Sequence, residues 1–368
     1  MAGATTTWEQ ATVPATKRTG AWLRGASWDL KWLIGSAIIV PLVLSLVWTG
    51  VGGEWIDLVV TLLVGGPHLF STVLTTYADP GFRRAHWPFL VVVVLAIPST
   101  VTYLAIHDVQ LLLSCFIFAA SIHVLHQNIY LTDLYRERSG QADSRASRVL
   151  DTMVLMLCMY PIAAYKLVSG NFYMGGMQVL IPRMLRVPAT FYAVSTVFAV
   201  VFVSWIVKTF REHRAGTLNV AKTMLILVTS VVAFSAPAAA ERERMEFAFQ
   251  SINAWHSFQY LAIVWLVLGL RKSRGIKTSK LVEKISGPGR ATYGFYGMCF
   301  AAAVVLVIAV RTFAVVDPFH LRPAQYFYMV VLSSLLMHYA IDGYMFAVSA
   351  RPGASVDKLP YAAPLGAD

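Results

Sequence analysis

Long apolar stretches separated by short polar loops constrain this chain more than any other feature. A helix needs about 20 apolar residues to cross the hydrocarbon core of a bilayer. Because a lipid environment admits only helices or closed barrels as spanning structures, the sequence predicts an all-α, polytopic transmembrane helical bundle of about ten spans. We place these spans at 31–50, 55–78, 87–106, 110–134, 149–168, 188–208, 220–239, 248–270, 293–316 and 324–350.

The composition leaves no room for a separate soluble domain, since 57% of the residues are hydrophobic and only 13% are charged. We predict a basic interfacial N-terminal segment over 1–30, which carries Trp8, Trp22 and Trp28. A single transmembrane helical domain follows over 31–350. Residues 351–368 are expected to form a cytoplasmic tail.

The basic residues are distributed unevenly between the two sides of the predicted topology. With both termini in the cytoplasm, 23 of the 30 Lys and Arg residues fall on the inner side, as expected for short cytoplasmic loops. This distribution also explains the net charge of +11 without any nucleic acid partner. We therefore expect an integral protein of the bacterial inner (cytoplasmic) membrane, with the lipid bilayer as its main partner.

Five histidines lie inside these apolar stretches: His68, His123, His126, His256 and His338. An ionisable side chain costs about 3 kcal/mol in hydrocarbon, so its presence there indicates function. His68, His123, His126 and His338 lie about 13 to 16 residues from the predicted outer ends of their spans, within about 5 Å in depth. His256 lies about two helical turns nearer the outer side. We predict that the five histidines bind metal in the middle of the membrane.

Other polar residues accompany these histidines at helical spacing. His123 and His126 share one face of their span. An acidic residue follows His338 by one turn, where a carboxylate either ligates a metal or accepts the N–H of a ligand histidine. The span of His256 carries three polar residues on the same face, and polar groups in hydrocarbon need partners. The accompanying residues are Asp342, Gln127, Gln259, Tyr260 and Asn253.

The types of ligand present favour some metals over others. Histidine with carboxylate or water, and without thiolate, suits non-haem iron best, with one or two ions, and copper or zinc are less favoured. The three cysteines, Cys115, Cys158 and Cys299, lie in separate spans without CxxC spacing, and we expect them to be packing residues. A metal at this depth is reached by lipophilic substrates.

Two short motifs resemble those of a known family. Gly66-Pro67-His68 is similar to the GxPH element of the Brp/Blh family of membrane-bound β-carotene 15,15′-dioxygenases, and His256-Ser257-Phe258-Gln259-Tyr260 is similar to its HSxxH element. Tyr260 stands where the family has a second histidine, and Leu69-Phe70 replaces a run of small residues.

This resemblance implies iron held by His68 and His256, with His123 or His126 completing the set, and oxidative cleavage of a polyene chain to aldehydes. His338 is the candidate for the ligand that Tyr260 does not supply.

The leading hypothesis from the sequence is a membrane-embedded non-haem iron oxygenase acting on a lipid, hydrocarbon or isoprenoid, including carotenoids. It would use a lipophilic small molecule and, depending on the reaction, an electron-donor protein or membrane partner subunits. One alternative is a subunit that ligates haem or pigment in an electron-transfer or photosynthetic complex. Another is a transporter with a relay of His and Asp residues.

Overall fold

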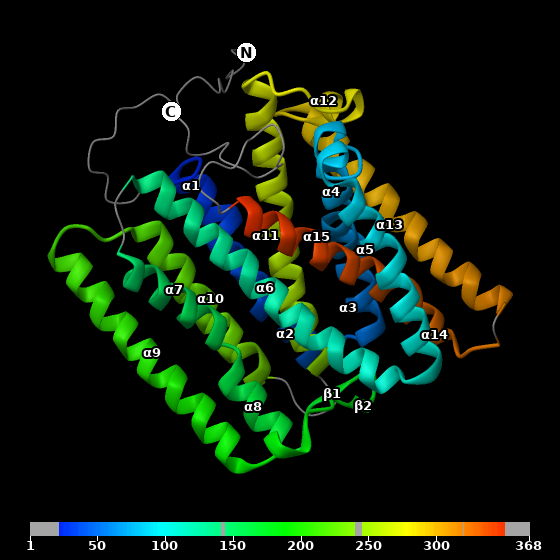
Figure 1. Cartoon of the computed structure of the whole chain (residues 1–368), viewed down its shortest axis with the longest axis horizontal. Helices are drawn as coiled ribbons and strands as arrows, with labels where there is room; N and C mark the ends of the chain where they lie inside the picture. Colours follow the sequence, from blue (N-terminus) through cyan, green and yellow to red (C-terminus); the bar gives the residue numbers. More distant parts are fainter. Residues whose placement is uncertain (1–21, 141–143, 240–244, 319, 350–368) are drawn as a thin grey trace.

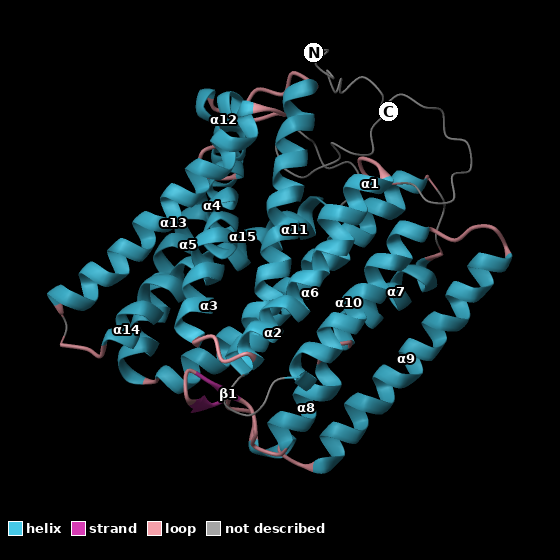
Figure 2. Ribbon diagram, turned by 180° about the vertical axis from the view of Figure 1, so that it is seen from behind, coloured by secondary structure: helices cyan, strands magenta, loops and turns pink. Residues whose placement is uncertain are grey.

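A computed structural model describes residues 22–140, 144–239, 245–318 and 320–349. Most of the predicted interfacial segment and the whole of the predicted tail over 351–368 therefore lie outside the described residues. Within the described ranges the fold is helical, apart from one short antiparallel hairpin in which Tyr173 pairs with Gln178 (Figures 1 and 2). The predicted all-α polytopic helical bundle is confirmed.

The elements are, in chain order, α1 (Ala26–Asp29), η1 (Leu30–Ile34), η2 (Gly35–Ile38), α2 (Ile39–Trp48), α3 (Gly53–Val60), η3 (Thr61–Gly65), α4 (Gly66–Thr75), α5 (Pro80–His107), α6 (Val109–Ser139), α7 (Arg145–Leu157), α8 (Tyr160–Val168), β1 (Tyr173–Met174), β2 (Met177–Gln178), η4 (Arg183–Leu185), α9 (Pro188–Arg214), α10 (Val220–Ala239), α11 (Met245–Ser273), α12 (Lys280–Ile285), α13 (Arg290–Val316), α14 (Pro323–Phe327), η6 (Tyr328–Leu332) and α15 (Ser333–Ser349).

Nine continuous helical segments in the described part of the chain are long and apolar enough to cross a membrane, which makes this an integral membrane protein. They are Ala26–Trp48, Trp55–Thr75, Pro80–His107, Val109–Ser139, Arg145–Val168, Pro188–Arg214, Val220–Ala239, Arg290–Val316 and Pro323–Ala347. Each coincides with one predicted span, although several begin earlier than predicted. The remaining predicted span, 248–270, corresponds to α11, whose length of 29 residues is sufficient but whose middle is rich in polar residues.

The polar helix α11 occupies the centre of the molecule. It packs against α2, α4 and α10, and it stands upright between the two halves of the bundle in Figure 2. Almost the whole of its middle section, from Ser251 to Leu268, is withdrawn from the surface. Because neighbouring helices surround α11, its polar side chains face protein and not lipid, which is the condition for keeping them in a membrane.

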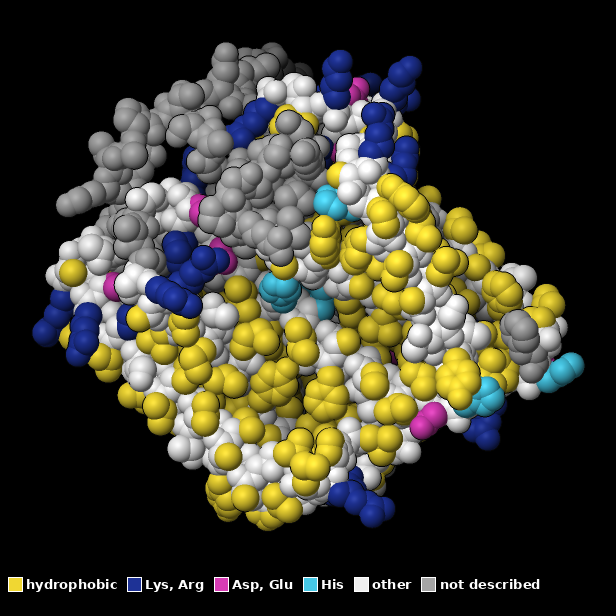
Figure 3. Space-filling model, in the orientation of Figure 1, with side chains coloured by type: hydrophobic (Ala, Val, Ile, Leu, Met, Phe, Trp, Pro, Cys, Tyr) yellow, Lys and Arg dark blue, Asp and Glu magenta, His cyan; other side chains and the backbone are white. Residues whose placement is uncertain are grey.

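The outer helices present apolar side chains to the surroundings. Val92 and Leu95 of α5, Val200 of α9 and Val305 of α13 are all more than half exposed. Figure 3 shows this apolar surface in yellow, with basic side chains gathered mainly along the upper and left edges. An exposed apolar band between more polar edges is the surface expected of a protein solvated by lipid.

A cluster of buried charges joins α6, α7, α9 and α10 near the basic edge. The carboxylate of Asp151 is fully buried and accepts from Arg136 Nη2 at 3.0 Å, Lys222 Nζ at 2.9 Å and Trp205 Nε1 at 3.0 Å. Lys208 forms a further ion pair with the same carboxylate. Buried charges are tolerated when they are paired in this way, so this cluster fixes the outer helices to α6.

The spanning segment that contains Pro67 changes geometry just before that residue. A π-helical turn, η3, precedes α4, and Pro67 lies in the first turn of α4. Proline has no N–H to bond the carbonyl of Leu63 four residues earlier, and the hydroxyl of Tyr296 in α13 donates to that carbonyl at 2.6 Å instead. At Gly66 a Cβ atom would collide with Ala303 of α13. Close contact with α13 therefore holds the start of α4.

Candidate metal centre

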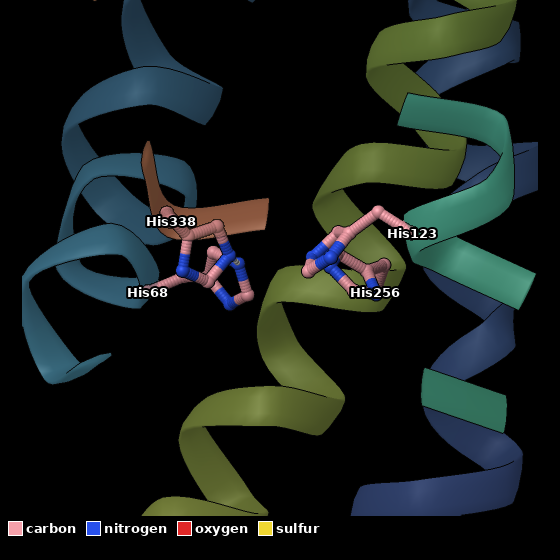
Figure 4. A group of neighbouring side chains, drawn as sticks. All are labelled: His68, His123, His256 and His338. Carbon is pink, nitrogen blue, oxygen red and sulfur yellow. Dashed lines mark hydrogen bonds between the residues drawn. The ribbon is translucent and has the colours of Figure 1, made fainter. Parts of the chain in front are cut away.

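Four of the five predicted histidines meet in the middle of the bundle. His68 comes from α4, His123 from α6, His256 from α11 and His338 from α15. One ring nitrogen from each lies within 4.8 Å of the corresponding nitrogen of every other histidine. None of the four side chains is more than 5% exposed. Figure 4 shows the four imidazoles turned toward one another from separate helices.

The rings contact one another mainly through their edges. Nε2 of His68 lies 2.5 Å from Nε2 of His338. The ring centroids of His123 lie 4.8 Å from those of both His256 and His338, at steep interplanar angles of 80° and 70°. Those of His68 and His256 are 4.9 Å apart at 63°. Edge-on packing directs nitrogen atoms, and not ring faces, toward the space that the four side chains share.

Several of these nitrogens have no hydrogen-bond partner among the described residues. They are His68 Nδ1, His123 Nε2 and both nitrogens of His256. A buried polar atom without a partner costs about 1–3 kcal/mol, so a cluster of four such atoms in one place needs a compensating ligand. Neutral imidazole nitrogens are good ligands for transition metals. The residues present therefore fit a metal ion.

Hydrogen bonds on the far side of His338 determine which of its nitrogens is free. Nδ1 of His338 lies 2.8 Å from the hydroxyl of Thr72, and that hydroxyl donates to Asp342 Oδ1 at 3.1 Å. Tyr260 also donates to Asp342 Oδ1, at 2.8 Å. Because the hydroxyl proton of Thr72 is used on Asp342, Nδ1 of His338 must be the donor to Thr72. Nε2 is then unprotonated and available to a metal.

A second network fixes the backbone near His256. Gln127 of α6 donates to the carbonyl of His256 at 3.2 Å and to Oε1 of Gln259 at 3.3 Å. Gln259 in turn donates to the carbonyl of Leu33 in η1 at 2.5 Å. Both amide side chains are fully buried. They join three segments around the site, so Gln127 and Gln259 hold the backbone next to His256 in place.

For Asn253 no contact with the four histidines is found among the described residues. Its amide donates to Gln250 on the same helix at 3.3 Å, and its side chain approaches Gly65 at the start of α4. The remaining predicted residues, Tyr260 and Asp342, do lie at the site, where both belong to the hydrogen-bonded group around His338. Asp342 Oδ2 has no hydrogen-bond partner and lies 3.6 Å from Nδ1 of His338.

His126 lies apart from the group, although the sequence placed it together with His123. Residues three positions apart on a helix differ by about 60° in direction and about 4.5 Å in height, so only one of the two rings points at the common centre. The ring of His126 packs against Phe346 with 5.6 Å between centroids. His256 lies in the group as predicted, although its depth counted along the span differed from that of the other histidines.

Two residues at the site were not singled out from the sequence. Thr72, one turn beyond His68 on α4, contacts Tyr260, His338 and Asp342. Tyr339 stacks on His123 with 4.2 Å between ring centroids and 22° between planes. The spacing of four residues between His68 and Thr72 was the available signal for the first. Tyr339 directly follows His338 in the sequence, and this position alone does not indicate a role at the site.

A groove between α5, α6 and α15 leads toward this centre. It encloses about 530 Å³ and is lined by Ala96, Ile97, Thr100, Val101, Ala119, Ile122, His123, His126, Leu336, Tyr339, Ala340 and Gly343. Most of these side chains are small or apolar. Figure 3 shows histidine surface, in cyan, within a hollow near the middle of this face. The groove therefore links one of the four histidines, His123, to the lipid-facing surface.

The site can be assessed only from its own geometry. Comparisons with family profiles, with curated proteins and with solved structures found no match. The cysteines stay outside the centre, with Cys158 and Cys299 buried elsewhere and Cys115 exposed. A ligand set of four imidazoles with a nearby carboxylate suits iron, copper or zinc. The arrangement can bind a metal ion next to an apolar groove.

Proposed function

We propose that the protein is a membrane-embedded non-haem iron oxygenase that acts on a lipophilic substrate. The observation that supports this most strongly is the convergence of four buried histidines from four helices, three of which have ring nitrogens without a hydrogen-bond partner among the described residues. An oxygenase of this kind also needs a route for its substrate. His123 lies on the wall of the groove, so an apolar substrate can reach the site from the bilayer. Zinc would suit hydrolysis, which needs water at the site, whereas the groove that leads to this site is lined mostly by apolar side chains.

The resemblance to the Brp/Blh family supports the same proposal. It implies His68 and His256 as ligands, together with His123 or His126, and three of these four residues lie in the group. His338 takes the place of a second histidine at position 260, where Tyr260 instead donates to Asp342. The substrate class that the resemblance implies is an isoprenoid polyene.

Bound iron would supply the activation of dioxygen. The chain itself orients the ligands, through Thr72 and Asp342 for His338 and through Gln127 for the backbone of His256. The apolar walls of the groove exclude water and align the hydrocarbon chain. In a cleavage of a C=C bond, that bond and the O=O bond break and two C=O bonds form. Both oxygen atoms come from one O₂, so no external reductant is needed.

The packing favours an ion over haem at this position. Axial ligands of haem approach from opposite faces of a flat macrocycle, which must lie between them. Here all four imidazoles are in mutual edge contact, with centroids 4.3 Å apart for His68 and His338 and 4.8 Å apart for His123 and His256. The rings fill the space that a porphyrin would occupy, so this geometry does not support the haem-binding alternative.

We place the protein in a bacterial inner membrane with both ends in the cytoplasm, as the clustering of basic side chains at one edge supports (Figure 3). For a monooxygenation, which consumes two electrons, this edge would be the docking surface of an electron-donor protein. For a dioxygenation no such partner is required.

Elemental analysis and a visible spectrum of detergent-purified protein test the proposal. We expect about one iron per chain, since the four histidines share a single centre, and no intense absorption bands of haem or chlorin. Oxygen consumption with isoprenoid polyenes then tests the reaction. Purified protein that retains zinc and no iron after expression with both metals supplied would refute the oxygenase assignment, as would an intense haem spectrum.

A further inference from the structure

The groove between α5, α6 and α15 has a floor built from small residues. Ala340 and Gly343 lie on the α15 side, and Ala96 and Ala119 lie on the opposite sides. A Cβ atom added at Gly343 would meet nothing within 4 Å. The floor is therefore open enough to receive a chain from the surrounding lipid without any rearrangement of the helices.

The inner end of the groove touches the metal centre directly. His123 belongs both to the four-histidine group and to the groove lining. Tyr339, which stacks on the His123 ring at 4.2 Å between centroids, also lines the groove. A molecule lying in the groove would thus contact the side chains that hold the ion, which is the position required of a substrate.

His126 is the polar residue that the metal centre leaves unused. It lines the same groove and is only partly buried. Within the described part of the chain its ring contact is with Phe346, and no hydrogen bond to either of its nitrogens is found. It lies within the apolar length of α6, where an imidazole without a partner is costly. A polar group on the molecule in the groove would satisfy it.

On the basis of the proposed function, we infer that the groove is the substrate site and that His126 binds a hydroxyl or carbonyl group of the substrate. The substrate is then a long-chain isoprenoid or alkyl alcohol or carbonyl compound, and not a pure hydrocarbon. His126 lies about 4.5 Å farther along α6 than His123, so the polar group lies close to the bond that reacts. A site that hydrogen-bonds a substrate group discriminates strongly against analogues that lack it.

Binding of two matched fluorescent probes tests this inference. The probes are a long-chain conjugated polyene alcohol and the polyene hydrocarbon of the same length, and their affinities are measured by energy transfer from tryptophan in the purified full-length protein. The variants are Ala340→Phe, which fills the groove, His126→Phe, which keeps an aromatic ring of similar size, and His126→Gln, which keeps a donor and an acceptor. Ile308→Phe on α13 is the matched control, since Ile308 is 57% exposed and is not among the residues that line the groove. Iron content is measured for every variant.

We expect the native protein to bind the alcohol about fivefold to tenfold more tightly than the hydrocarbon, as one additional hydrogen bond predicts. His126→Phe should remove this preference and His126→Gln should restore it in part. Ala340→Phe should weaken binding of both probes, and Ile308→Phe should change neither. Iron content should stay unchanged throughout, because none of these residues belongs to the four-histidine group.

Two results would overturn the inference. Unchanged binding of both probes to Ala340→Phe would show that they bind elsewhere, and an alcohol preference that survives in His126→Phe would exclude His126 as the polar partner. The proposed function fails separately: a protein without iron that still shows the expected probe pattern has this binding site but is not an iron oxygenase.

Discussion

Two regions of this protein bury polar side chains, and they differ in whether those side chains have partners. Around Asp151, at the basic edge of α6, α7, α9 and α10, the carboxylate is met by Arg136, Lys208 and Lys222. Around His256 in the centre, histidines from four helices meet, and three of them, His68, His123 and His256, have ring nitrogens without a hydrogen-bond partner among the described residues. Satisfied polar groups stabilise a fold, whereas an unsatisfied cluster indicates a ligand that the chain itself does not supply.

The largest expected effect concerns the charged region. Asp151→Asn should destabilise the protein by about 3–5 kcal/mol, because it leaves several buried cations without their carboxylate. Unfolding in detergent by denaturant measures this loss. The double variant Asp151→Asn with Lys222→Met removes one unpaired cation and should recover part of the stability. If the double variant recovers no stability, unpaired buried cations are not the cause of the loss in Asp151→Asn.

The second prediction concerns the centre. His338→Ala should lower iron affinity roughly 100-fold, equivalent to about 3 kcal/mol, with little change in the stability of the metal-free protein. The measurement is iron content after dialysis against a graded series of chelator concentrations. Asn253→Ala, on α11 but away from the four histidines, is the control and should retain iron. If both variants retain iron equally, the unpartnered nitrogens of the centre do not indicate a metal site.

A smaller effect is expected for the residue that orients His338. Thr72→Val keeps the shape of the side chain but removes the hydroxyl that lies 2.8 Å from Nδ1 of His338. Iron affinity should fall about tenfold, as for other groups that orient a ligand. Thr72→Ser restores the hydroxyl and should restore affinity. If Val and Ser at this position bind iron equally, then Thr72 does not orient the histidine.

The smallest effect is expected at the exposed edge of the charged region. Arg148 pairs with Asp133 at 2.6 Å, but its side chain is 49% exposed. Arg148→Gln should therefore cost less than about 1 kcal/mol. The same denaturant unfolding experiment checks this value. If Arg148→Gln loses as much stability as Asp151→Asn, then burial does not determine how much an ion pair contributes to stability in this protein.

Much of the fold follows from sequence because hydropathy determines where a chain can cross a membrane. The spans over 220–239 and 293–316 agree closely with α10 and α13. The π-helical turn η3 before Pro67 was not predicted, since the carbonyl of Leu63 in this turn is bonded by Tyr296 of another helix. Helix existence is a local property, whereas helix geometry depends on neighbours.

The site was predicted in part for the same reason. The number of residues from the outer end of each span grouped His68, His123 and His338 correctly, but it placed His256 at another depth. The helices tilt relative to one another (Figure 1), so equal numbers of residues do not give equal depths in the membrane. His126 was grouped wrongly with the centre because helical spacing specifies a shared face but not the point at which each ring is aimed. Thr72 became apparent only when α4 and α15 were brought together.

The polarity of α11 has a consequence for how the protein is made. A segment that carries His256, Gln259 and Asn253 gains less from contact with lipid than the other spans do, so the bilayer alone holds it weakly. Its neighbours η1, α2, α4, α6 and α10 are all synthesised before it, and η1 and α6 offer a carbonyl and an amide partner to it. α11 therefore enters the membrane when its earlier neighbours are already present. Assembly of the four-histidine centre depends on this order of synthesis.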